Sequence, residues 1–190
     1  MSGFQRTRIY NKEVMVDIET LSTQSNAVIL SIGAIKFDRN GSLPGSPDDM
    51  DTFYVRVARE SCEVLGMHVD PETVRWWNTQ PADVRDEALE NTSERLTIKD
   101  ALTRFEAWIG KSELMWGHGD DFDCVILSSA FQSCGMKTPW KFWNTRDTRT
   151  LFDIAGVRNS DLPSNSKHHP IHDCYRQVAG VLMSLRKLGR

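Results

Sequence analysis

Two acidic residues, Asp17 and Glu19, lie within the apolar run VMVDIET at residues 14–20. Alternate residues of a β-strand point to the same face, so a strand here would place the two carboxylates side by side. Like charges among apolar neighbours repel each other and are costly to desolvate, and bound cations remove that cost. The pair therefore indicates a metal site, although a strand end whose two acids face water would show the same pattern.

Two further acidic positions complete a candidate site. Asp123 follows a short apolar segment in WGHGDDFDCVIL, and Asp173 lies near the start of a helical stretch in HHPIHDCYRQV. Mg²⁺ and Mn²⁺ prefer oxygen ligands, and two such ions about 4 Å apart suit phosphodiester hydrolysis. Acids at helix starts are also favoured by the helix dipole and as caps, so Asp120 and Asp121 could share or imitate the role of Asp123.

Three histidines, His168, His169 and His172, precede Asp173. A histidine beside an activated water suits the role of general base, because its pKa lies near neutrality. Histidine is also a common zinc ligand, so a structural zinc site is a competing interpretation. Neither a cysteine nor a second histidine cluster offers the remaining ligands at the usual spacing, which favours the general base.

The elements that must position these residues alternate in type along the chain. Strands are expected at 14–20, 27–37, 52–57, 113–117 and 141–145, and helices at 70–80, 81–90, 97–110, 120–135, 146–156 and 172–189. Three strands joined by turns predict an antiparallel meander, and the later strands alternate with helices. We therefore expect a mixed α/β sheet flanked by helices, in a single domain over 1–190 with a small helical insertion around 70–95.

The overall composition excludes few functions. The formal net charge of −3 and the pI of about 6.0 do not indicate a strongly basic nucleic-acid-binding face, but an acidic protein can be basic locally. The four cysteines form no C-x-x-C pair, which predicts a reduced, cytoplasmic protein. The sequence contains neither an apolar signal core nor a run long enough for a membrane span, so we expect no membrane association.

Taken together, these motifs resemble the histidine-containing (DEDDh) branch of the DEDD superfamily of 3′–5′ exonucleases. The closer likeness is to small bacterial and phage exoribonucleases of the mycobacterial type, and it is carried by DIETLSTQSNAVILSIGAIKF, TVRWWNTQ, WGHGDDFDCVIL, PWKFWNTRDTRTL and HDCYRQV. The family motifs D-x-E, Phe-Asp at a helix start and H-x-x-x-x-D are matched in order by Asp17 and Glu19, by Phe122 and Asp123, and by His168 and Asp173.

The resemblance implies a ribonuclease H-like fold and a magnesium- or manganese-dependent nuclease. In that case Asp17, Glu19, Asp123 and Asp173 bind two Mg²⁺ or Mn²⁺ ions. His168 deprotonates the attacking water, and nucleoside 5′-monophosphates leave from the 3′ end of single-stranded RNA or DNA. The likeness is also compatible with a homodimer.

The resemblance further implies contacts to the substrate. In the family, the turn after D-x-E holds the terminal nucleotide, which implicates Ile18, Thr20 and Leu21. Phe122 could wedge against the terminal base, or simply pack at its helix start. Neighbouring helix residues point about 100° apart, so only one residue of the Trp76–Trp77 pair is expected in the core. The other, taken as Trp77, could stack on a base or cover a partner subunit.

Some positions depart from the family pattern. His118 stands where the subgroup commonly has Asn, and His172 where an acid often precedes the last Asp. Arg146 and Arg149 could bind phosphate or pair with a nearby acid such as Asp147. The alternative to an enzyme is a binding module on a nuclease fold, and the sequence does not distinguish RNA from DNA.

Overall fold

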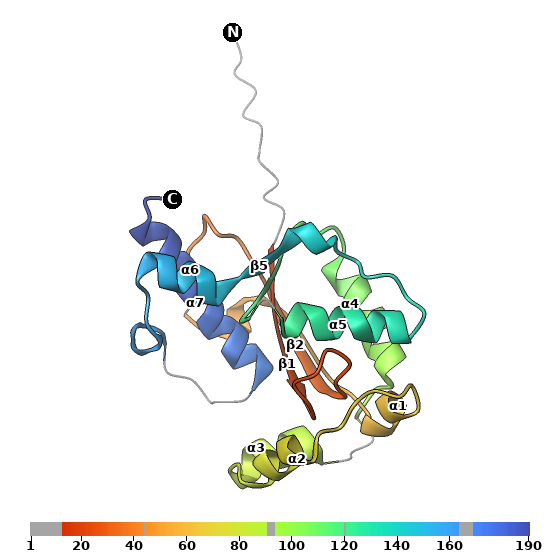
Figure 1. The fold of residues 1–190 in the computed structure, drawn as a ribbon. Coiled ribbons are helices and arrows are strands. Elements are labelled where there is room, and N and C mark those ends of the chain that lie inside the picture. The colour runs from red at the N-terminus through yellow and green to blue at the C-terminus, as the bar shows by residue number, and fades with distance from the viewer. Residues whose placement is uncertain (1–12, 44, 91–93, 120, 164–168) are drawn as a thin grey trace.

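The computed structural model describes residues 13–43, 45–90, 94–119, 121–163 and 169–190 (Figure 1). Its centre is one five-stranded sheet with the order β3-β2-β1-β4-β5. The first three strands pair antiparallel, whereas β4 pairs parallel to β1 and to β5. The mixed sheet predicted from the sequence is thus confirmed. The strands are β1 (Glu13–Thr20), β2 (Ile29–Phe37), β3 (Asp51–Arg56), β4 (Met115–Gly117) and β5 (Thr145–Asp147).

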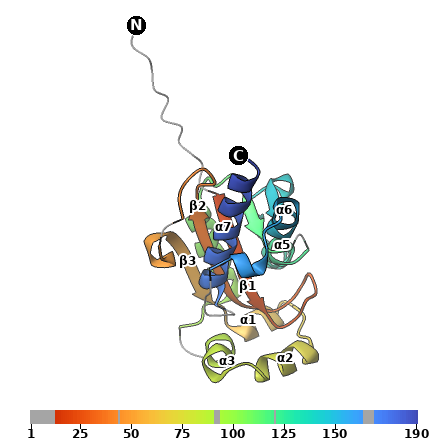
Figure 2. The same cartoon turned by 90° about the vertical axis from the view of Figure 1, so that its left-hand side faces the viewer.

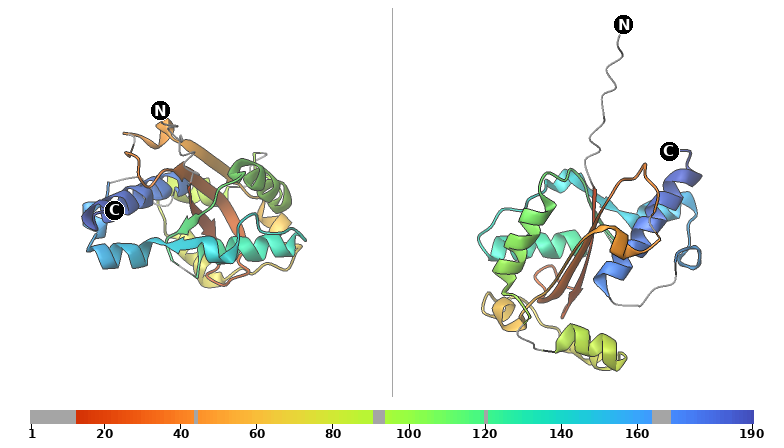
Figure 3. Two further views of the ribbon diagram at one scale, coloured as in Figure 1. Left: turned by 90° about the horizontal axis from the view of Figure 1, so that it is seen from above. Right: turned by 180° about the vertical axis from the view of Figure 1, so that it is seen from behind.

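Helices cover both faces of this sheet and its lower end as drawn in Figure 1. Helices α6 and α7 pack together over one face, α4 and α5 lie over the other, and α2 and α3 lie beyond the end of β1 (Figures 1, 2 and 3). The helices are α1 (Arg59–Glu63), α2 (Pro71–Asn78), α3 (Ala82–Leu89), α4 (Ile98–Ile109), α5 (Asp123–Ser133), α6 (Thr148–Ala155) and α7 (Pro170–Lys187). Within these described ranges, no helix is long and apolar enough to cross a membrane.

The alternation of β1 assigns its side chains to two different layers. Val14, Val16 and Ile18 belong to the apolar core that includes residues of α4 and α5. Met15 belongs to the second core, which includes residues of α6 and α7. Asp17 and Glu19 follow Met15 at steps of two, so they point to the face that α7 covers.

Helix α7 lies close against the sheet because β2 carries a glycine at the contact. Gly33 is paired with Asp17 across the two strands. A Cβ atom at Gly33 would lie 2.4 Å from Cβ of Pro170 and 2.9 Å from its backbone carbon. Pro170 is the first residue of α7, where its missing N–H costs no helical hydrogen bond. The glycine therefore allows the start of α7, which carries Asp173, to approach β1.

Arg95 attaches the α2–α3 segment to the sheet. Its guanidinium donates hydrogen bonds of 3.1 Å to the carbonyls of Leu30 and Val57, and of 3.1 and 2.7 Å to those of Glu87 and Ala88 near the end of α3. The bonds to Glu87 and Ala88 satisfy carbonyl groups that the end of α3 leaves without intrahelical partners. One side chain thus fixes α3 relative to β2 and to the end of β3.

Two details differ from the sequence prediction. The last strand was expected at 141–145 but is β5, at Thr145–Asp147, because 142–144 form a 3₁₀ turn closed by a bond from Asn144 N–H to the Lys141 carbonyl. Pairing with β4, itself three residues long, begins at Thr145. The short helix α1 was not anticipated.

Gly33→Ala should destabilise the protein by about 1–3 kcal/mol, as overpacking of a close contact does. The added methyl group must displace the start of α7, so the variant should also bind divalent cations more weakly. Urea unfolding and a Mn²⁺ titration measure the two effects. Gly45→Ala is the matched control, because no atom lies within 4 Å of a Cβ there. Equal stability of the two variants would contradict the proposed contact.

Candidate active site

Three of the predicted acids meet on the face of the sheet that α7 covers. One carboxylate oxygen from each of Asp17, Glu19 and Asp173 lies within 4.8 Å of the other two. The first two acids come from the end of β1, and the third comes from the first turn of α7. This spacing is that of a set of oxygen ligands able to share a cation.

Asp123, the fourth predicted acid, is anchored beside this group by backbone donors. Its Oδ1 accepts a hydrogen bond of 3.2 Å from the Ile18 N–H, and its Oδ2 accepts one of 3.0 Å from the His118 N–H. The carboxylate also lies against Gly117, where a Cβ would be 3.1 Å from Oδ2. Asp123 is buried at the first position of α5 and is thereby held against both β1 and the end of β4.

The cluster of carboxylates is electrostatically strained. Burial raises the pKa of Asp17 well above its ordinary value, and the charges of Asp123, Glu19 and Asp173 raise it further. Burial and the charge of Asp173 raise the pKa of Glu19 to about 8. The pKa of Asp123 rises to about 6 through burial, although its backbone N–H bonds oppose the rise. Burial and mutual repulsion therefore both favour the protonated forms of these groups, and added positive charge would oppose that effect.

The donor set fits the divalent cations that the resemblance implies. All of the ligand atoms are carboxylate oxygens, which suit Mg²⁺ and Mn²⁺. A cation would also remove the repulsion that raises these pKa values. The predicted metal ligands Asp17, Glu19 and Asp173 are therefore brought together, and Asp123 borders them.

The histidines are only partly placed. His168 lies outside the described residues, as does Asp120. His169 stands at the cap position of α7, where its ring stacks on Tyr54 with centroids 5.0 Å apart. His172 lies edge-on to it at 4.9 Å. Burial lowers the pKa of His169, and the assignment of the general base to His168 stays a prediction.

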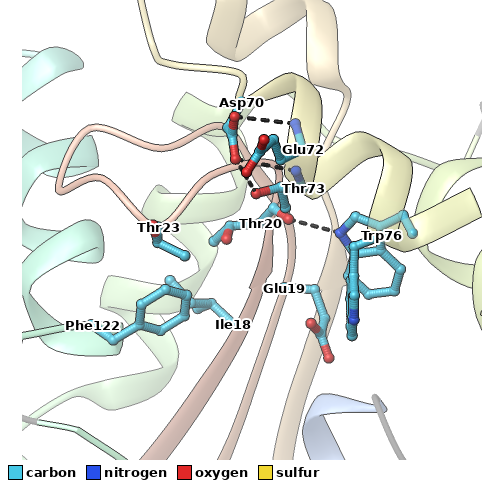
Figure 4. A pocket seen from close by; sticks show the side chains of 10 residues that line it. Ile18, Glu19, Thr20, Thr23, Asp70, Glu72, Thr73, Trp76 and Phe122 are labelled. Carbon is cyan, nitrogen blue, oxygen red and sulfur yellow. Dashed lines mark hydrogen bonds between the residues drawn. The ribbon is translucent and has the colours of Figure 1, made fainter.

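A pocket of about 460 Å³ opens beside Glu19 (Figure 4). In this view, Glu19 lies between the Ile18 and Phe122 side chains on one side and Trp76 on the other. The predicted substrate residues Ile18, Thr20, Phe122 and Trp77 all line it. The other lining residues are Glu19, Thr23, Asp70, Glu72, Thr73 and Trp76.

The two tryptophans have different environments, as expected for neighbouring helix residues. Trp77 is buried, and its Nε1–H donates a 2.9 Å hydrogen bond to the Thr20 carbonyl. Trp76 is 43 % exposed, so it offers the larger accessible ring surface. The choice of Trp77 as the ring outside the core was therefore wrong, because which of the two is exposed depends on how α2 is rotated against β1.

Two predicted nucleotide contacts are less available than the sequence implied. Leu21 is fully buried in the core and does not belong to the lining of this pocket. The Thr20 hydroxyl donates a hydrogen bond of 2.6 Å to the Ser22 carbonyl, so it can only accept further bonds.

The sequence analysis missed Gln177, which belongs to the site. Its Nε2 donates a 2.9 Å hydrogen bond to Asp17 Oδ1. It lies on α7 four residues after Asp173, and residues at this spacing share a helix face. That spacing was the available signal, but a single glutamine in a long helix has no motif to distinguish it.

The structure also shows the contacts of Arg146 and Arg149, the two arginines near α6. Arg146 donates to the carbonyls of Trp143 and Thr145. The Asp147 carboxylate caps α6 by accepting the backbone N–H groups of Arg149 and Thr150. The Arg149 guanidinium packs against Gly119, in the loop that borders Asp123. Of the two arginines, Arg149 is therefore the one near the carboxylates.

The mixed sheet covered by helices is a ribonuclease H-like fold with a carboxylate cluster on one face, and comparison with known proteins identifies the family. The model of the 3′-5′ exoribonuclease Rv2179c-like domain matches residues 12–185. The chain belongs to that family, which places it among the 3′–5′ exonucleases.

Individual relatives are more distant. An exodeoxyribonuclease of Enterobacteria phage T4 is 22 % identical over 203 residues, which cover 92 % of this chain and 89 % of that protein. E. coli exonuclease I in a zinc-bound complex with single-stranded DNA superimposes with a TM-score of 0.65 at 15 % identity, over 95 % of this chain. Its complex with a dA16 oligonucleotide gives a TM-score of 0.61 at 16 % identity, over 93 % of this chain. The chain spans 41 % of the exonuclease I chain in both cases, and at this identity the likeness concerns the fold.

The raised pKa values predict how stability depends on pH in metal-free protein. Between the ordinary pKa of Glu19, 4.5, and its folded-state value of about 8, the folded protein holds a proton that the unfolded chain has released. Rising pH in this window therefore favours unfolding. We expect the melting temperature of metal-free protein to fall from pH 6 to pH 8. Added Mn²⁺ should raise the melting temperature more at pH 8 than at pH 6.

Asp17→Asn supplies the control, because a neutral amide removes one of the repelling charges. The variant should show a smaller fall in melting temperature and a smaller response to Mn²⁺. A metal-free melting temperature that rises with pH in the parent protein would contradict the electrostatic account.

Proposed function

We propose that this chain hydrolyses single-stranded nucleic acid from its 3′ end and releases nucleoside 5′-monophosphates. The observation that carries the proposal is the carboxylate cluster directly beside a pocket. Glu19 belongs to both, so a nucleotide in the pocket would place its phosphate at the metal ligands. Because the relatives carry both exoribonuclease and exodeoxyribonuclease names, RNA and DNA are both proposed substrates.

We propose that Asp17, Glu19, Asp123 and Asp173 hold two Mg²⁺ or Mn²⁺ ions. When bound, such ions activate the attacking water and neutralise charge that develops on the phosphate and the leaving oxygen. The protein contributes the ligand geometry: β1 presents Asp17 and Glu19, and the first turn of α7 presents Asp173. Within this proposal, His168 accepts the proton of the water.

The terminal nucleotide is proposed to occupy the pocket beside Glu19. The apolar walls of this pocket are the side chains of Ile18 and Phe122 on one side and the exposed ring of Trp76 on the other. An aromatic ring stacks on any base, which suits an enzyme that degrades a strand of arbitrary sequence. Arg149, beside the Asp123 loop, is proposed to contact a backbone phosphate, since guanidinium groups bind phosphate well.

Asp17→Asn and Asp173→Asn should each abolish degradation while leaving the fold intact, because each removes a charge from the ligand set. The measurement is loss of 5′-labelled RNA and DNA oligomers in Mg²⁺ or Mn²⁺, with circular dichroism to check folding. Asp153→Asn, at an exposed acid on α6 outside the proposed ligand set, is the matched control and should retain activity. Normal degradation by either ligand variant would overturn the proposal.

His168→Ala should lower kcat by roughly 10²–10⁴-fold, the usual contribution of a general base. Binding of Mn²⁺ should be nearly unchanged, since the residue is not a proposed ligand. His169→Ala and His172→Ala are the comparison variants. If His168→Ala kept full turnover and one of the other two lost it, the base would be reassigned to that histidine.

Trp76→Ala should raise KM for an oligomer roughly 5- to 150-fold, since stacking contributes about 1–3 kcal/mol per base. Trp143→Ala is the control, because Trp143 is also exposed but precedes β5, at the end of the sheet opposite Glu19. An unchanged KM for Trp76→Ala, or an equal rise in both variants, would exclude a stacking role in the pocket.

A further inference from the structure

Gln177 is a buried polar residue directly behind the carboxylate cluster. Its side-chain amide donates a 2.9 Å hydrogen bond to Asp17 Oδ1, across 160 residues of sequence. The residue is 7 % exposed, and its neighbours on α7, Cys174 and Val178, are fully buried in the core between the helix and the sheet. Gln177 is therefore enclosed by the core on one side and by Asp17 on the other.

Burying the side-chain amide of Gln177 at this position costs free energy. Gln177 Oε1 is buried and accepts no hydrogen bond from the described part of the chain. A buried acceptor without a partner costs on the order of 1–3 kcal/mol, whereas an apolar side chain of the same length would avoid that cost. Packing alone does not explain a glutamine here, so its donor group is the feature that distinguishes it from methionine.

The bond to Asp17 has a counterpart at Asp123. Both oxygens of Asp123 accept backbone N–H groups, from Ile18 and His118, and these bonds fix the direction of its carboxylate. Asp17 points away from the backbone of β1 toward α7, where Gln177 reaches one of its two oxygens. A bond to Oδ1 restricts rotation of the carboxylate about its last torsion and determines which oxygen faces Glu19 and Asp173.

We propose that Gln177 is a positioning residue, which holds the Asp17 carboxylate in the orientation that binds the divalent cations. Because Gln177 and Asp173 lie one helical turn apart on α7, the same helix supplies a ligand and the group that orients another ligand. Asp17 is thus oriented by α7, and any displacement of the helix would change both acids together. The inference rests on the proposed metal-binding role of Asp17.

The test measures binding of Mn²⁺ alone to metal-free protein by isothermal titration calorimetry. Gln177→Met keeps the length and volume but removes the donor, and Gln177→Asn keeps the amide but withdraws it by one methylene group. Both variants should bind Mn²⁺ about 10–100-fold more weakly, the usual effect of losing an outer hydrogen bond to a metal ligand. The melting temperature of metal-free Gln177→Met should equal or exceed that of the parent, since the unsatisfied acceptor is gone.

A positioning role also separates the kinetic constants. The Mn²⁺ concentration for half-maximal rate should rise by the same factor as the dissociation constant, while KM for the oligomer stays unchanged. Ser184→Ala is the matched control. Ser184 is a buried polar residue two turns further along α7 whose hydroxyl also has no described hydrogen-bond partner, and its variant should bind Mn²⁺ normally.

Several outcomes would overturn the inference. They are unchanged Mn²⁺ affinity in both Gln177 variants, an equal loss in Ser184→Ala, or failure of both Gln177 variants to fold, which would assign the residue to the core. Asp17→Asn separates this inference from the proposed function. If Asp17→Asn binds Mn²⁺ as the parent does, the proposed metal site itself fails. If Asp17→Asn loses Mn²⁺ binding but both Gln177 variants bind Mn²⁺ as the parent does, the positioning role fails and the proposed metal site stands.

Discussion

Repulsion among carboxylates is the constraint on which the rest of this structure depends. Asp17, Glu19 and Asp173 present oxygens within 4.8 Å of one another, and burial together with mutual charge raises the pKa of Glu19 to about 8. A chain selected for stability alone would not keep acids in such a place. The fold must therefore hold them together against their own repulsion, and the energy for this comes from the two apolar cores on either side of β1.

The means of holding them is close backbone approach. Gly33 lets the start of α7 lie against β2, and Gly117 leaves room for the Asp123 carboxylate at the end of β4. Hydrogen bonds then fix directions: backbone N–H groups orient Asp123, and Gln177 reaches Asp17. Rigid ligands reduce the entropy lost on binding a cation, so the packing that brings the acids together also prepares the site.

The pocket beside Glu19 depends on the same strand. Trp77 donates to the Thr20 carbonyl, which ties α2 to the end of β1 just beyond Glu19. Arg95 ties the end of α3 to β2 and to the end of β3. A helical segment with little core of its own thereby becomes the wall of a pocket whose opposite wall is the strand that carries the acids. In the proposed function, recognition of a strand end and the chemistry at its phosphate are in this way coupled through β1.

By itself, the sequence determined the mixed-sheet fold class and most of the helices and strands, and it indicated the acids of the candidate site. The alternation in VMVDIET placed Asp17 and Glu19 on one face, because alternation along a strand is a local signal. Three separate facts came only from the tertiary structure: that Trp76 rather than Trp77 is exposed, that Leu21 is buried, and that Gln177 reaches Asp17. Each depends on how a helix or turn is rotated and seated on the sheet. Contacts between residues far apart in the sequence, such as Trp77 with Thr20 and Gln177 with Asp17, decide that placement, and no local pattern encodes it.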